Sequence, residues 1–225
     1  MSSHSGVHAQ GFAAATREAF AQLESWAGRG GAQSNSTGGW AHEDSIHEDL
    51  ASTVIEFWRA AGPELWFAKD ADFDRRFRET FLPMHEAAAR GELTGWVATA
   101  HGALALLLLL DQFPRNAFRG TSRMYATDPL AREVASLVIR AGHDQHVAAE
   151  LRLFFYLPFA HSEHPDDQDR SVALNGHLGQ PHLSHAERHR DIIRRFGRFP
   201  HRNPLLGRTM TPREQQFLDD GGYAG

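Results

Sequence analysis

The sequence predicts an all-α protein of about eight helices, stacked as antiparallel pairs. Apolar residues recur at helical spacing along most of the chain. Helix caps and glycine stops interrupt this pattern, with mostly short connections between the helices they delimit. No segment of useful length alternates between apolar and polar residues, so no strand is predicted.

The pattern of the N-terminal residues predicts an appendage, residues 1–45. The appendage is attached to a single helical domain, residues 46–225. Within the appendage, residues 11–27 carry apolar side chains on one helical face. Residues 28–40 are rich in glycine and serine, a composition that is typical of a flexible linker. We therefore expect the first helix to be tethered to the domain and dispensable for its folding.

Capping signals place the helices of the main domain. Ser45 with Glu48 and Ser184 with Glu187 read as capping boxes, and Pro158 is expected to end a short apolar helix. Other helices are expected to begin at Asp70 or Asp72, Thr99, Asp128 and Thr211. Three are expected to end before Gly62, Gly91 and Gly142. The predicted helices span about 46–61, 71–90, 99–113, 129–141, 148–157, 166–178, 185–196 and 212–219.

Composition limits the classes of function. The formal net charge of −5 argues against general nucleic-acid binding. The longest apolar run, residues 103–110, is far shorter than the roughly 18 residues of a membrane span. The chain has no cysteine, and its first thirty residues do not read as a signal peptide. A cytoplasmic protein that binds neither membranes nor nucleic acid is expected.

The most informative segment is residues 188–203, which holds six arginines, two histidines and one aspartate. Gly197 reads as a left-handed helix stop, after which Arg198, His201, Arg202 and Asn203 lie on a loop stiffened by prolines. Guanidinium groups bind carboxylates and phosphates, so the loop predicts an anion site. The alternative is that these arginines form salt bridges with neighbouring helices.

A second polar group lies at the end of the leucine-rich helix, where Asp111, Arg115 and Asn116 surround Pro114. The helix itself should be buried, so these side chains are expected at an edge of the core. Arg115 suits a helix C-terminus, and Asp111 can pair with it or with an arginine of the C-terminal loop. Ligand binding and a purely structural cluster both remain open.

A third polar group follows Pro158, where His161 and Glu163 are expected on a loop. Histidine suits acid–base chemistry near neutral pH, and a carboxylate can orient it. Glu163 could instead cap the next helix. Ser162 lacks a nucleophile-elbow motif and is a weak candidate. The histidine-rich C-terminal half does not predict a metal site, because arginines surround the pair His185 and His189.

Three segments resemble a known family: residues 108–116, 155–163 and 189–203, together with Trp66–Asp70. They closely resemble the bacterial domain-of-unknown-function family 924, over about residues 50–220. The resemblance implies a tetratricopeptide-like helical domain and carries no established activity. One departure is Phe57-Trp58, which is followed by Arg59 where the family has a Phe-Gly-like continuation.

The leading hypothesis is a site for a small anionic molecule. In an enzyme, this site would use arginine, histidine and carboxylate chemistry, for which the sequence specifies neither the reaction nor a cofactor. Candidate anion ligands are Arg115, Arg198 and Arg202, with Asn116 and Asn203 beside them. His161 or His201 would move a proton, and Asp111, Glu163 or Asp191 would orient these groups. The alternative is a non-catalytic helical-repeat module that binds a peptide or protein.

Overall fold

A computed structural model describes the chain from residue 40 to residue 225, with side chains from residue 48 onward. The predicted helix 11–27 and residues 28–39 of the predicted linker lie outside this range. The boundary between appendage and domain therefore stays a prediction.

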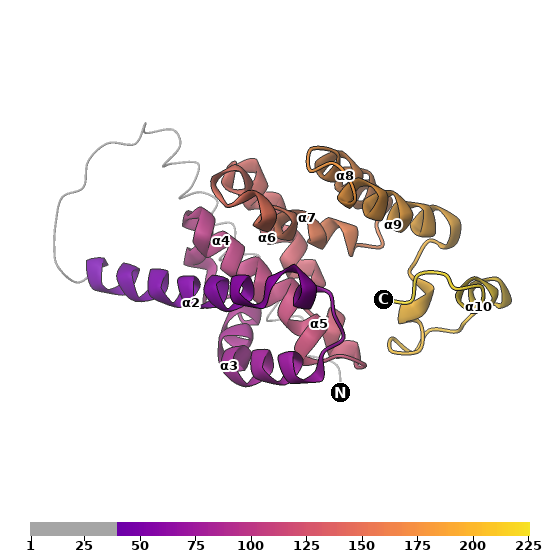
Figure 1. Ribbon diagram of the computed structural model, residues 1–225, viewed down its shortest axis with the longest axis horizontal. Helices are drawn as coiled ribbons and strands as arrows, with labels where there is room; N and C mark the ends of the chain where they lie inside the picture. The colour runs from indigo at the N-terminus through magenta and orange to yellow at the C-terminus, as the bar shows by residue number, and fades with distance from the viewer. Residues whose placement is uncertain (1–39) are drawn as a thin grey trace.

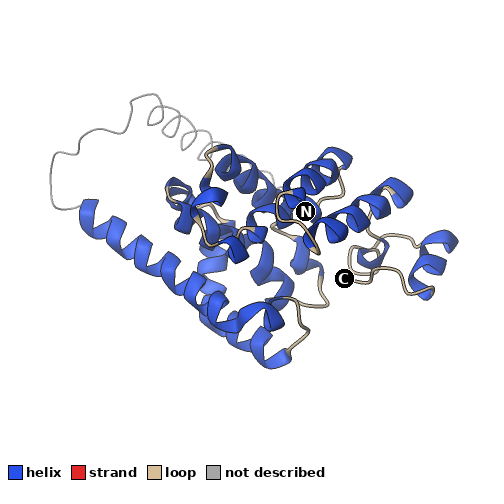
Figure 2. Cartoon of the chain, turned by 45° about the horizontal axis from the view of Figure 1, so that its top comes forward, coloured by secondary structure: helices blue, strands red, loops and turns tan. Residues whose placement is uncertain are grey.

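Every regular element of residues 40–225 is helical (Figures 1 and 2), which confirms the all-α prediction. A π-helical turn, Leu108–Gln112, joins α4 and α5 into one rod, so the described residues contain eight α-helical rods, of which α2 is kinked. The α-helices are α2 (Trp40–Trp66), α3 (Ala71–Ala89), α4 (Ala100–Leu107), α5 (Phe113–Ala117), α6 (Asp128–Arg140), α7 (Leu153–Ala160), α8 (Pro165–Gly176), α9 (His182–Phe196) and α10 (Pro212–Asp219). Short 3₁₀ turns connect them: η1 (Thr94–Ala98), η3 (Ser122–Tyr125), η4 (His143–His146), η5 (Ala149–Leu151) and η6 (Pro200–Arg202).

The core forms around the buried α4–α5 rod. Helices α2, α6 and α7 pack on α4, and α3 packs on α5. All residues from Gly102 to Leu110 are buried, as the leucine-rich sequence predicts. Figure 1 shows α8 and α9 side by side next to this body, with α10 beyond them. A small second cluster, centred on Ile192, Ile193 and Phe199, holds the C-terminal part together. None of the described helices is long and apolar enough to cross a membrane.

Several helix starts agree with the predicted caps. The Asp70 side chain accepts a hydrogen bond from the backbone N–H of Phe73 at 2.7 Å. Thr99 likewise caps α4, and Thr211 forms a capping box with Glu214 at the start of α10. Each cap satisfies N–H groups that the first helical turn leaves without partners, so these starts depend on local sequence alone.

The predicted start at Ser45 is wrong, because α2 already begins at Trp40 and runs through the Ser45–Glu48 pair. The helix is nevertheless interrupted at Gly62, whose φ of 74° and ψ of 171° leave the helical region, as predicted. A final short turn then continues to Trp66, which donates from its indole nitrogen to the Trp58 carbonyl at 2.6 Å.

Two other boundaries also differ from prediction. Helix α9 begins at His182, one turn before the predicted start, because the Gln180 side chain accepts from the backbone N–H of Ser184. Ser184 donates to that same oxygen and does not act as the cap. Helix α7 continues through Pro158 to Ala160. The proline costs one backbone hydrogen bond, but nearly all of α7 is buried, and that packing outweighs the loss.

Candidate functional site

The π-helical turn Leu108–Gln112 positions the first residues of the site. Pro114 cannot donate a backbone hydrogen bond, and the N–H of Phe113 bonds to the Leu108 carbonyl, five residues back. Four side chains form hydrogen bonds with backbone carbonyl oxygens of the turn. His85 Nδ1 bonds to the Leu109 carbonyl at 2.9 Å, and Thr127 Oγ1 donates to the Leu110 carbonyl at 2.5 Å. Arg115 Nη1 donates to the Asp111 carbonyl at 2.7 Å, and Asn116 Nδ2 donates to the Gln112 carbonyl at 2.9 Å. The distorted turn thereby fixes Asp111 and Arg115 at the edge of the core.

Asp111 forms a buried pair with His161, which follows the last residue of α7. Asp111 Oδ1 lies 2.8 Å from His161 Nδ1, and Oδ2 accepts from the Gln112 side chain at 2.6 Å. The Asp111 side chain is 1% exposed. Burial alone would raise its pKa, but Arg115 and His161 outweigh burial and lower the pKa to about 2. Asp111 is therefore ionised at neutral pH.

His161 is held neutral. Burial lowers its pKa, and the positive charge of Arg115 adds to this, against the opposing effect of Asp111. Because Asp111 can only accept, the imidazole proton sits on Nδ1, and Nε2 carries the lone pair. The pair thus has the arrangement of an oriented general base.

Two arginines flank this pair and share Asp128, the first residue of α6. Arg115 Nη1 lies 2.8 Å from Asp128 Oδ1 and 3.2 Å from Asp111 Oδ1. Arg202 Nη1 lies 3.5 Å from Asp128 Oδ2, and its Nη2 donates to the His161 carbonyl at 2.9 Å. Asp128 was predicted as the helix cap, but the residue in the cap position is Thr127. The side chain of Asp128 instead holds Arg115 and Arg202 together.

Aromatic rings and two further histidines complete the cluster. The Arg202 guanidinium stacks 4.5 Å from the Tyr125 ring centroid. On α9, the His189 ring centroid lies 4.6 Å from that of Tyr223, and His201 in η6 lies 5.1 Å from the same ring. Burial, followed by neighbouring positive charge, lowers the pKa of His189 to about 3 and that of His201 to about 4. Both rings are neutral at pH 7.

Among the residues with described side chains, four buried nitrogen atoms of this cluster find no hydrogen-bond partner: Arg115 Nη2, Arg202 Nε, His189 Nδ1 and His201 Nδ1. The two carboxylate oxygens of Asp128 also lack a hydrogen bond and contact Arg115 and Arg202 only as ion pairs. Buried polar atoms in folded proteins are nearly always paired, so such a concentration at one place needs an explanation. A bound group that pairs with these nitrogen atoms is one such explanation.

We name this set, Asp111, Arg115, Asp128, His161, His189, His201 and Arg202, the Asp111–His161 cluster. The structure brings five predicted site residues into it: Asp111, Arg115, His161, His201 and Arg202. Sequence reasoning missed Asp128 and gave His189 no site role. The sequence signal for His189 is its place beside the predicted anion loop, about two turns after Pro181, which precedes α9.

The other predicted residues lie outside the cluster. Arg198 turns toward α10, where its Nε and Nη2 contact the two carboxylate oxygens of Glu214 at 2.6 and 2.8 Å. Asn116 accepts from Arg119 at 2.9 Å, on the side of α3. Asp191 is exposed on α9, two residues from His189 and therefore on a different side of the helix.

Glu163 and Asn203 support the loop that carries His201 and Arg202. Glu163 accepts from the backbone N–H of Phe199 and from Arg208 Nη1, both at 2.9 Å. These donors lower the pKa of Glu163 despite its burial. Asn203 is fully buried next to Met210. Both residues therefore anchor the loop against α7 and the chain leading to α10.

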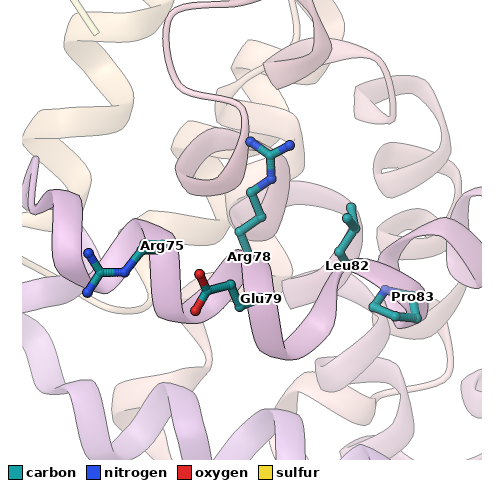
Figure 3. A pocket seen from close by; sticks show the side chains of 5 residues that line it. All are labelled: Arg75, Arg78, Glu79, Leu82 and Pro83. Carbon is teal, nitrogen blue, oxygen red and sulfur yellow. The ribbon is translucent and has the colours of Figure 1, made fainter.

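Two further observations bear on the site. Within residues 48–225, no group of three or more histidine, aspartate or glutamate side chains is arranged to hold a metal ion. A hollow on the protein surface lies along one side of α3 (Figure 3). It is lined by Arg75, Arg78, Glu79, Leu82 and Pro83, none of which belongs to the Asp111–His161 cluster.

Fold and site together define a helical protein with a buried histidine–carboxylate pair between two arginines. The chain belongs to the family described as "Bacterial protein of unknown function (DUF924)", which it matches over residues 54–222. It is similar to a solved structure of a protein of unknown function from Agrobacterium tumefaciens, with 57% sequence identity and a TM-score of 0.76. The similarity covers 77% of this chain and 99% of that chain. No curated protein matches. The family prediction is confirmed, and the tetratricopeptide-like arrangement stays a prediction.

Proposed function

We propose that the Asp111–His161 cluster binds a small anionic molecule and acts on it by acid–base chemistry. The observation that carries the proposal is the buried pair of Asp111 and His161 beside Arg115 and Arg202. Arg115 Nη2 and Arg202 Nε have no hydrogen-bond partner among the described side chains and backbone. Guanidinium groups that are buried and incompletely paired favour an oxyanion.

The proposed chemistry assigns one role to each group. His161 accepts a proton from the ligand at Nε2, and Asp111 stabilises the imidazolium that forms, through the 2.8 Å contact at Nδ1. Arg115 Nη2 and Arg202 Nε donate hydrogen bonds to oxygens of the ligand. A cytoplasmic location belongs to the same proposal and is supported by the absence of cysteine.

Anion-dependent thermal unfolding tests this proposal. We expect phosphate, sulfate or malonate to raise the Tm of the full chain by about 3–6 °C at ten times the Kd. Arg202→Met should abolish this rise, since methionine keeps apolar contact with Tyr125 but removes the charge and the donors. Arg188→Met is the matched control, because Arg188 is exposed on α9.

Each variant is compared with itself in the absence of anion, which separates binding from any loss of stability and from general salt effects. Arg202→Lys replaces the methionine variant if that variant does not fold. It should reduce the anion-dependent increase in Tm. An unchanged Tm in the parent with all three anions, or an equal rise in the Arg202 and Arg188 variants, contradicts the proposal.

A second candidate function is binding of a peptide or protein, and the hollow along α3 favours it (Figure 3). Its lining combines Arg75 and Arg78 with Glu79 and an apolar end at Leu82, a mixture that suits a polypeptide segment. This candidate becomes the better one if none of the anions binds.

A further inference from the structure

We propose that His189 and His201 are ligand-binding residues of this site and that the ligand carries a phosphate-type dianion. The two histidines take up protons when the dianion binds. The inference rests on the proposed anion site and adds the class of ligand and the source of the balancing charge.

The first argument is the charge of the cluster. Arg115 and Arg202 carry two positive charges, and Asp111 and Asp128, with which they are paired, carry two negative charges. These four groups therefore cancel one another. A buried dianion needs a compensating positive charge. Among the remaining groups of the cluster, only histidines can supply it near neutral pH.

The second argument is the position of the two rings. Within the part of the chain whose side chains are described, His189 Nδ1 and His201 Nδ1 are buried without a hydrogen-bond partner, whereas His161 Nδ1 is already bonded to Asp111. The rings of Tyr223 and Phe199 pack against both histidines, with centroid distances between 4.6 and 5.7 Å. A protonated histidine donates from both nitrogens, so an oxyanion at this position would satisfy both atoms.

The groups around the histidines decide when they take up protons. His189 faces His161, which follows α7, and His185 on its own helix. It also faces Arg202 and His201 of η6, and Tyr223. His201 faces Arg202, Glu163, His161, Lys69 and Tyr223. On α8, Asp169 is engaged by Arg194 at 2.9 Å and Arg190 at 3.8 Å. Positive and neutral groups dominate, which keeps both histidines uncharged until an anion enters and reverses the balance.

The third argument favours a phosphoryl group over a carboxylate. The four unpartnered nitrogens come from three separate elements, α5, α9 and η6. A phosphoryl group offers three strong acceptor oxygens, and its second charge matches the second histidine. A single carboxylate offers two oxygens and one charge.

Calorimetric titration of the full chain tests the inference, with sulfate and inorganic phosphate as probes and acetate for comparison. Sulfate stays a dianion throughout the pH range used, so any pH dependence belongs to the protein. Heats measured in buffers of different ionisation enthalpy give the number of protons taken up. We expect the protein to take up between about one and two protons for each sulfate bound at pH 7. The Kd should then increase about tenfold for each unit of increase in pH and each proton taken up.

The variants His189→Gln and His201→Gln should each remove most of one proton of uptake, and the double variant should bind sulfate weakly and without pH dependence. His177→Gln is the matched control, because His177 is exposed at the end of α8. The uptake in the parent is informative even where a variant fails to fold.

The outcomes separate the two proposals. Sulfate binding by the parent with no proton uptake and a constant Kd overturns this inference and leaves the anion site standing. Uptake that persists in the double variant assigns the protons to His161 and also overturns it. Acetate binding tighter than sulfate overturns the ligand class. If the parent binds none of the probes, the proposed anion site itself is wrong.

Discussion

Replacing Asp111 by asparagine tests the buried pair at the centre of the site. The variant keeps the size of the side chain and one acceptor oxygen, but it removes the charge that faces His161 at 2.8 Å and Arg115 at 3.2 Å. The pKa of Asp111 falls from its ordinary value of 3.8 to about 2. At about 1.4 kcal/mol per pKa unit, this shift corresponds to roughly 2 kcal/mol of stability at neutral pH.

A larger loss, about 3–5 kcal/mol, is typical when one partner of a buried ion pair is left without any counter-charge. Arg115 keeps Asp128 at 2.8 Å, so the lower figure applies here. Urea unfolding followed by circular dichroism at pH 7 should therefore show Asp111→Asn to be less stable than the parent by about 2 kcal/mol. Asp72→Asn is the control, because the Asp72 side chain is 76% exposed, and its stability should be close to that of the parent.

The pH dependence has a definite sign. The folded-state pKa of Asp111 lies below the unfolded value, so its contribution is complete above about pH 4 and disappears as the pH falls from about 4 to about 2. The difference between parent and variant should shrink over that window. A loss below about 0.5 kcal/mol at pH 7, or a difference that is the same at pH 2.5, would refute the view that the charge of Asp111 stabilises the fold.

Two further predictions concern acid stability and packing. Burial lowers the pKa values of His189 and His201 to about 3 and about 4, so the unfolded chain binds more protons below its ordinary histidine pKa of 6.5. The Tm should fall as the pH drops from about 6.5 toward 4, and glutamine at either position should flatten that slope; a parent Tm that stays constant over this range contradicts the assignment. Gly102→Ala should cost about 1–3 kcal/mol, because its Cβ would overlap the Trp96 carbonyl oxygen, whereas Gly95→Ala meets open space. Equal unfolding midpoints for the two alanine variants would contradict this prediction, because they would show that the backbone of α4 shifts to accommodate the added Cβ.

Much of the fold was predictable because its signals are local. The caps at Asp70, Thr99 and Thr211 act on N–H groups within three residues, and the sequence displays them directly. The boundaries that differ, such as the start of α9 at His182, depend on a competing side chain or on burial of the whole helix. Residue type and spacing do not reveal either effect.

The candidate site likewise combines features that are visible in the sequence with features that depend on the tertiary structure. The sequence by itself determined which polar segments matter, since Asp111, His161 and Arg202 all stand in motifs that the residues single out. Only the tertiary structure decided that Asp111 meets His161, fifty residues away, while Arg198 pairs with Glu214. A cap is chosen by the few residues around it, whereas the partner of a buried charge is chosen by which helices pack together, because a charge taken out of water needs the nearest opposite charge wherever the fold puts it.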